Sequence, residues 1–117
     1  MHEIYLWRET DWSTMDLTGY KVEATDGDIG KVDEATTEQS GGFIVVDTGP
    51  WIFGKKVMLP AGVIQSVDHD DGKIFVNLTK DEIKDAPEFD PDTYRDEAYR
   101  TQLGDYYGSR SRTALRR

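Results

Sequence analysis

The segment Gly49–Lys56 is the part of the sequence that comes nearest to a nucleotide-binding loop. It reads GPWIFGKK, with the glycine spacing and the lysine of a phosphate-binding loop. The eighth position is Lys56, where such a loop needs a hydroxyl side chain to bind Mg²⁺. The segment also joins two predicted strands, so no helix N-terminus is available for the phosphates. We therefore expect a hairpin loop here and no bound nucleotide.

Two acidic turns contain residue types that could bind a metal ion. Asp26–Gly30 begins like a calcium loop, but an EF-hand needs Asp or Asn at its fifth position, Gly at its sixth and Glu at its twelfth. The residues there are Gly30, Lys31 and Thr37. His69–Asp71 forms a second cluster, whereas a metal site needs three or four converging ligands, and the other histidine is His2. Both segments are predicted to be plain turns without a metal.

Nothing in the sequence marks a catalytic nucleophile. The chain has no cysteine, and its serines lack the neighbouring groups that would signal activation. Acidic side chains are so numerous that a pair suited to acid–base catalysis carries no information. We therefore predict no catalytic residue, no cofactor and no enzymatic activity. An enzyme or a ligand-binding barrel stays the less favoured alternative, because small barrels are usually filled by their own side chains.

Large aromatic and aliphatic residues are the better candidates for function, as protein-binding anchors. Two alternatives stay open for them: they pack on the body of the domain, or they contact a partner or a second copy of the chain. The candidates lie in the N-terminal segment, in a predicted loop and on a predicted helix. They are Trp7, Trp12, Trp51, Ile52, Phe53, Tyr99, Leu103, Tyr106 and Tyr107.

The elements that position these residues are mostly strands. Glycines and other turn residues interrupt the first 80 positions at short intervals, between short runs rich in Val, Ile and Phe, which is typical of a small barrel or sandwich. We predict six strands, at 20–24, 29–37, 43–47, 56–59, 63–68 and 73–78. The continuous apolar run 43–46 should be covered on both faces. A bulge near Gly30 would bring Ile29 and Val32 into phase, and residues 69–72 should form a hairpin turn.

Two helices are expected after the last strand. Thr79 and Glu82 have the spacing of a capping box, and Pro87 should end the short helix that follows. Asp90-Pro91 looks like a second helix start, with proline at the first helical position. One face of that helix is predicted to be largely aromatic. It consists of Tyr99, Leu103, Tyr106 and Tyr107. The fold class is therefore mainly β, with a short helix after the last strand and a C-terminal amphipathic helix.

Charge is distributed unevenly along the chain. The formal net charge is −9, but four of the 14 basic residues lie in the last nine positions. Those four are Arg110, Arg112, Arg116 and Arg117. Residues 1–108 keep ten basic against 23 acidic side chains, a charge of −13, which disfavours nucleic-acid binding except through this tail. No apolar stretch predicts a membrane span or a signal peptide, so we expect a cytoplasmic protein.

Several short segments, taken in order, resemble the PRC-barrel family, named after the cytoplasmic domain of the photosynthetic reaction-centre H subunit. They are LTGYKV at 17–22, GDIGKV at 27–32, MLP at 58–60 with Val63, VD at 67–68 and TKDEIKDAP at 79–87. LGDYYG at 103–108 looks like the end of free-standing bacterial members. The resemblance covers about residues 15–90 and implies a small, partly open β-barrel. It brings no catalytic residues, because members are mostly adaptor modules.

The resemblance and the residues together favour a non-catalytic protein–protein interaction or adaptor module. The alternative is a ribosome- or RNA-associated factor, since a similar barrel occurs in a ribosome maturation factor. We predict a homodimer with a protein partner of unknown identity, the strand 43–46 and the aromatic ends packing across a two-fold axis. The expected organisation is an aromatic extension at 1–14, a barrel at 15–88, a helix at 89–108 and a basic, disordered tail at 109–117.

Overall fold

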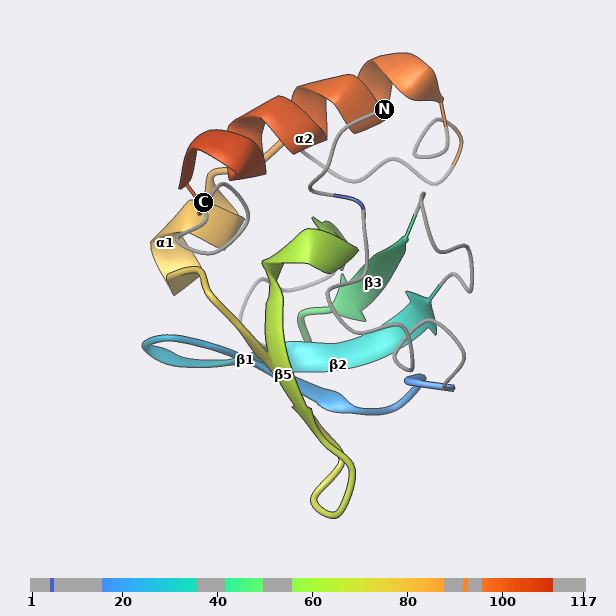
Figure 1. Ribbon diagram of the computed structural model, residues 1–117, viewed down its shortest axis with the longest axis vertical. Helices are drawn as coiled ribbons and strands as arrows, with labels where there is room; N and C mark the ends of the chain where they lie inside the picture. Colours follow the sequence, from blue (N-terminus) through green and yellow to red (C-terminus); the bar gives the residue numbers. More distant parts are fainter. Residues whose placement is uncertain are drawn as a thin grey trace.

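The computed structural model describes Tyr5, residues 16–35, 42–49 and 56–87, Asp92 and residues 96–110, the side chains of the last two excepted. Within these residues the chain forms one six-stranded sheet and two α-helices (Figure 1). The strands are β1 (Lys21–Ala24), β2 (Gly27–Ala35), β3 (Phe43–Asp47), β4 (Lys56–Pro60), β5 (Ile64–Asp68) and β6 (Lys73–Val76). The helices are α1 (Lys80–Lys84), α2 (Glu97–Arg110) and the short 3₁₀ helix η3 (Ala61–Val63).

The sheet is curled, although it is not closed into a barrel. Its strand order is β4-β3-β2-β1-β6-β5, with β1 and β6 parallel and every other neighbouring pair antiparallel. A flat sheet would separate the edge strands β4 and β5 by about 24 Å. Only η3 joins them, and so short a connection reaches about 14 Å. The sheet must therefore bend until its two edges approach, which confirms the predicted mainly β, partly open architecture.

Two bulges in β2 accommodate this bend. Ile29 is the extra residue where Val22 faces Gly30 and Glu23 faces Asp28, which confirms the bulge predicted near Gly30. Asp33 is a second extra residue, opposite the step from Val46 to Val45 in β3. Bulges increase the local twist of an antiparallel pair. As a result Ile29 and Val32 both point into the core, where they are 1 % and 3 % exposed.

The core lies inside the curl and extends beneath α2. Ile44 and Val46 of β3 face inward with Val32, and Phe43 and Val45 point to the opposite side. All four residues of the run 43–46 are buried, which confirms that both faces of β3 are covered. The second covering comes from α2 and Tyr5, since the Arg100 guanidinium lies 5.8 Å from the Phe43 ring centroid and 4.5 Å from that of Tyr5.

The helices begin and end largely where local signals place them. The Thr79 hydroxyl accepts a hydrogen bond from Glu82 N at 3.2 Å, and the Glu82 carboxylate accepts one from Thr79 N at 2.8 Å, so the capping box is confirmed. In the structure α2 begins at Glu97, not near Pro91 as predicted. Strand boundaries differ by two residues at most: β2 begins at Gly27 instead of Ile29, and β6 ends at Val76 instead of Leu78. The predicted end of the second strand at Thr37 lies outside the described residues.

Candidate interaction surface

A row of charged residues crosses all six strands on the outer face of the sheet. Each residue lies opposite the next in register, in the order Lys56, Asp47, Lys31, Lys21, Lys73 and Asp68. Residues in register share a face, and the rows on the two sides of this one contain the buried pairs Val46–Val32 and Val22–Ile74. The four lysines, here called the lysine row, therefore point away from the core in a chain whose net charge is −9.

Two lysines of the row are held by acidic neighbours. Lys56 Nζ lies 2.8 Å from Asp33 Oδ2, and this hydrogen bond raises the pKa of Lys56. Lys73 Nζ lies 3.4 Å from Glu23 Oε2. Within the described part of the chain, Lys21 and Lys31 have no ion pair with a carboxylate. Two exposed ammonium groups thus sit on facing positions of β1 and β2 without a counter-ion from the described residues.

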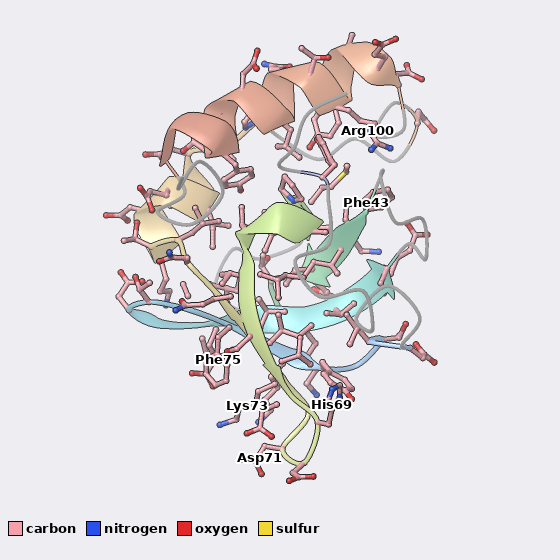
Figure 2. All side chains as sticks on the ribbon, viewed as in Figure 1. Phe43, His69, Asp71, Lys73, Phe75 and Arg100 are labelled. Atoms are coloured by element: carbon pink, nitrogen blue, oxygen red, sulfur yellow. The ribbon has the colours of Figure 1, made fainter. Side chains whose placement is uncertain are left out.

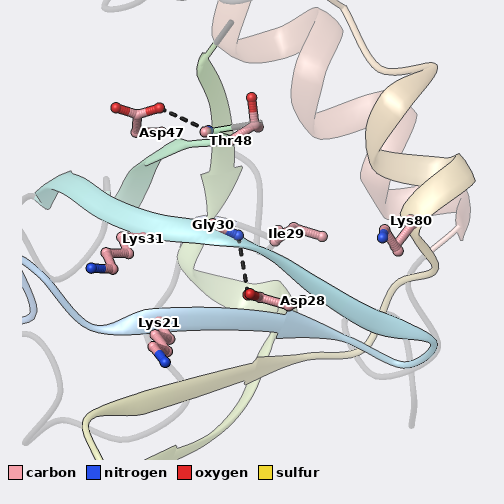
Figure 3. Close-up of a pocket in the computed structure, with 9 residues that line it drawn as sticks. Lys21, Asp28, Ile29, Gly30, Lys31, Asp47, Thr48 and Lys80 are labelled. Atoms are coloured by element: carbon pink, nitrogen blue, oxygen red, sulfur yellow. Dashed lines mark hydrogen bonds between the residues drawn. The ribbon is translucent and has the colours of Figure 1, made fainter. Parts of the chain in front are cut away.

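Beside Lys21 and Lys31 the surface is hollowed into an open cleft of about 540 Å³. Figure 3 shows the two lysines on neighbouring strands at one side of this cleft and Lys80 at the other. Two carboxylates also line it, but each already accepts a backbone hydrogen bond: Asp28 from Gly30 N at 3.3 Å and Asp47 from Gly49 N at 3.0 Å. The cleft is therefore lined by lysine ammonium groups and by carboxylates that accept hydrogen bonds from nearby backbone N–H groups.

Gly30 is the residue that lets the cleft wall form. Its φ of 145° lies in the region that favours glycine, and a Cβ built there would stand 2.1 Å from the Asp47 carbonyl oxygen. Only a residue without a side chain allows β2 and the end of β3 to approach so closely. The position of Lys31, the next residue, depends on this contact.

Phe75 adds an apolar group to the same outer face. It lies two residues beyond Lys73 on β6 and faces Glu23 on β1 and Ser66 on β5. Its side chain is only partly buried, whereas Ile74 and Val76 on either side are buried. Figure 2 shows Phe75 and Lys73 on the β5–β6 hairpin, at the end of the molecule away from α2. Sequence reasoning missed Phe75 as a site residue, although the alternation of buried and exposed residues in β6 would have placed it on the outer face.

The predicted aromatic face of α2 covers the chain's own core. Leu103 and Tyr107 are fully buried, Tyr99 is 9 % exposed and Tyr106 is partly buried against the core. Tyr99 and Tyr106 donate hydroxyl hydrogen bonds to the carbonyls of Pro87 (3.4 Å) and Glu82 (2.5 Å). Of the two alternatives left open for this face, the described residues show packing on the chain's own core. The strand 43–46, expected at a two-fold axis, is likewise covered by this chain.

Tyr5 beneath α2 and Tyr107 of α2 itself are both buried. The Tyr5 hydroxyl donates to the Arg100 carbonyl at 2.8 Å, and the Tyr5 carbonyl accepts from Gly42 N at 2.8 Å. Burial raises the pKa of both Tyr5 and Tyr107 well above the usual value. The buried Tyr107 hydroxyl has no hydrogen-bond partner among the described residues. Tyr5 therefore links α2 to the residue before β3, and neither tyrosine reaches the surface.

The other predicted site residues are placed as follows. Trp7, Trp12, Trp51, Ile52, Phe53, Arg112, Arg116 and Arg117 lie outside the described residues, and Arg110 is the last residue of α2, its side chain not described. His69–Gly72 forms the predicted hairpin between β5 and β6. The Tyr20 hydroxyl lies 3.3 Å from His69 Nδ1 there. No group of three metal-binding side chains occurs in the parts of the chain that the structure describes.

The helices that the structure describes include none that is long and apolar enough to cross a membrane. No protein-family model matches the sequence. An uncharacterized protein of Deinococcus radiodurans is 35 % identical to this chain over a match of 99 residues, and the match covers 81 % of this chain and 34 % of that protein. The chain thus spans about a third of the length of this curated relative.

Proposed function

We propose that this chain is a non-catalytic protein–protein interaction module of the PRC-barrel type, and that it acts in the cytoplasm. The outer face of β2, β1 and β6 is its docking face, defined by Lys31, Lys21, Lys73 and Phe75. The observation that carries the proposal is the pair of facing lysines, Lys21 and Lys31, which lack a counter-ion within the described residues. The curled, open sheet that the resemblance implied supports the type of module.

Facing lysines are unfavourable for the isolated chain. Like charges directly opposite on neighbouring strands are destabilising, by roughly 0.2–1 kcal/mol relative to a neutral pair. A carboxylate of a bound partner would replace this repulsion with attraction. The exposed lysine side chains also lie beside a cleft in which that carboxylate could be partly shielded from solvent. Binding of a carboxylate is therefore favoured because it relieves the repulsion between Lys21 and Lys31, a pair that the fold itself does not require.

A protein partner fits this face better than a nucleic acid does. The net charge of −9 repels a phosphate backbone over long range. The carboxylates of Glu23, Asp28, Asp47 and Asp68 lie on the same outer face as the lysines. They would oppose a continuous line of phosphates, whereas backbone N–H groups of a peptide can donate to them.

A tagged pull-down from the lysate of the source organism, with and without nuclease, tests the proposal. The wild-type chain is compared with Lys31→Glu and with Lys84→Glu, an exposed lysine of α1 that undergoes the same charge change away from the docking face. We expect a stoichiometric protein partner that survives nuclease, is lost with Lys31→Glu and is retained with Lys84→Glu. A partner retained by both variants would contradict the proposal. Recovery of ribosomal proteins only without nuclease would favour the RNA-associated alternative and its arginine-rich tail.

A further inference from the structure

We infer that the partner presents an acidic segment carrying an apolar side chain, with carboxylates over Lys21 and Lys31 and the apolar group on Phe75. This inference rests on the proposed function, because it identifies the chemistry of what the docking face binds. It is carried by the arrangement of a charged row and one aromatic ring on a single face.

The electrostatic part of the inference comes from the lysines that remain available. The Lys73 ammonium is already near the Glu23 carboxylate, at 3.4 Å. Asp28 and Asp47 are engaged by Gly30 N and Gly49 N. Lys21 and Lys31, by contrast, have no ion pair within the described residues, so they are the groups whose charge a partner can neutralise. The complementary group is a pair of carboxylates.

The apolar part comes from Phe75. Its ring is partly exposed next to Ser66 and Glu23, without an apolar neighbour in register on β1 or β5. A partly exposed aromatic ring within a polar rim is the arrangement found at the anchor positions of protein interfaces. A leucine or phenylalanine of the partner would bury the ring that the chain's own residues leave exposed.

The spacing of the two parts limits the segment. Lys21 and Phe75 lie on adjacent strands and two residues apart along them, so their Cα atoms are separated by about 8 Å. In an extended peptide, side chains two to three residues apart span about 7–10 Å. The acidic and apolar residues of the partner are therefore expected two or three positions apart. A single-stranded RNA could instead stack a base on Phe75, but it carries a charge at every phosphate, whereas a peptide can place its carboxylates over Lys21 and Lys31 alone and away from Glu23.

Fluorescence anisotropy with the full chain at low salt tests the inference with four labelled probes. They are a short serine-rich peptide with two glutamates and a Leu-Phe pair two positions away, the same peptide without the apolar pair, a version with lysine in place of glutamate, and oligouridine RNA. We expect the Leu-Phe acidic peptide to bind best and the lysine peptide not to bind. Lys31→Glu should weaken both acidic peptides by about tenfold or more, and Lys84→Glu should leave them unchanged.

Phe75 variants provide the specific test of the apolar contact. Phe75→Ala should remove the preference for the Leu-Phe peptide over the acidic peptide without the apolar pair, and Phe75→Thr, which keeps strand propensity, repeats the test if the alanine variant unfolds. An unchanged preference, no binding by the wild type, or tighter binding of oligouridine would overturn the inference. If the acidic peptides fail but Lys31→Glu still loses the lysate partner, the inference is wrong and the proposed function stands. If the Lys31→Glu variant retains the lysate partner in the pull-down, the proposed function is wrong.

Discussion

Lys21 on β1 and Lys31 on β2 face each other directly in the antiparallel register, on the solvent side of a curled sheet. Their inward-pointing neighbours, Val22 and Val32, are both buried in the core. Because register and core packing are linked, the strands cannot slide to separate the two lysines without exposing the valines. The lysine pair is thus held in place by the hydrophobic core beneath it.

Replacing Lys21 with glutamate should stabilise the fold while it weakens partner binding. The new carboxylate would face Lys31 and turn a like-charge pair into an opposite-charge pair, which is expected to raise the free energy of unfolding by about 0.5 kcal/mol. Urea unfolding followed by circular dichroism measures this change. Lys84→Glu on α1 is the matched control and should not stabilise. A loss of stability in Lys21→Glu would show that the two ammonium groups do not repel each other appreciably.

Gly30→Ala should destabilise the protein strongly. The added Cβ would clash with the Asp47 carbonyl oxygen, and alanine is strained at the φ of 145°. We expect a loss of about 3 kcal/mol or more, measured by thermal or urea unfolding. Gly72→Ala is the control, because Gly72 also has a positive φ of 64° but open space around it. It should cost only about 1 kcal/mol, and equal losses in the two variants would argue against the close approach at Gly30.

The two neighbouring tyrosines of α2 should respond in opposite ways to loss of their hydroxyl groups. Tyr106→Phe removes the hydrogen bond to the Glu82 carbonyl and should cost about 1 kcal/mol of stability. Tyr107→Phe removes a buried hydroxyl that has no partner within the described residues, so it should be neutral or stabilise by about 1 kcal/mol. The midpoints of urea unfolding of both variants and the wild type measure these changes in stability. Destabilisation by Tyr107→Phe would reveal a partner for that hydroxyl.

Alkaline pH should destabilise the fold through Tyr5 and Tyr107. Burial raises the pKa of both in the folded state, whereas in the unfolded chain tyrosines ionise near pH 10. Above about pH 10 the unfolded chain releases protons that the folded chain retains, so the free energy of unfolding falls as pH rises. Each tyrosine contributes up to about 1.4 kcal/mol per pH unit, and below about pH 9 the effect is absent.

Urea unfolding between pH 8 and pH 11 measures this dependence. Tyr107→Phe should make the fall less steep, because one of the two shifted groups is gone. A slope that is the same for the wild type and Tyr107→Phe would mean that other groups cause the alkaline loss of stability.

Local sequence signals were sufficient for most of the fold. The capping box at Thr79 and Glu82, the hairpin at 69–72 and the bulge near Gly30 are each specified by residues close together in the chain, and all three are present. The second bulge at Asp33 was missed, although the consecutive charged residues Asp33 and Glu34 break the alternation of apolar and polar residues there. The start of α2 was placed too early, because proline at a first helical position permits a helix but does not require one.

The docking face could not be predicted in the same way. Lys31 follows Lys21 by 10 residues, and Lys73 follows Lys31 by 42. Only the pairing of β1 with both β2 and β6 brings the three lysines into one row. Likewise, amphipathic spacing showed that Tyr99, Leu103 and Tyr107 share a face of α2, but spacing is the same for a face that binds a partner and one that covers the chain's own sheet.

The sequence by itself therefore determined the strands, turns, helix cap and apolar faces, because these depend on backbone preferences and on the periodicity of neighbouring residues. Only the tertiary structure decided which faces stay exposed. Curling the sheet and closing α2 over β3 and β4 buries the aromatic residues of the helix, while the parallel pairing of β1 with β6 leaves the lysines and Phe75 outside. Burial and strand pairing are properties of contacts between distant segments, which no local pattern contains.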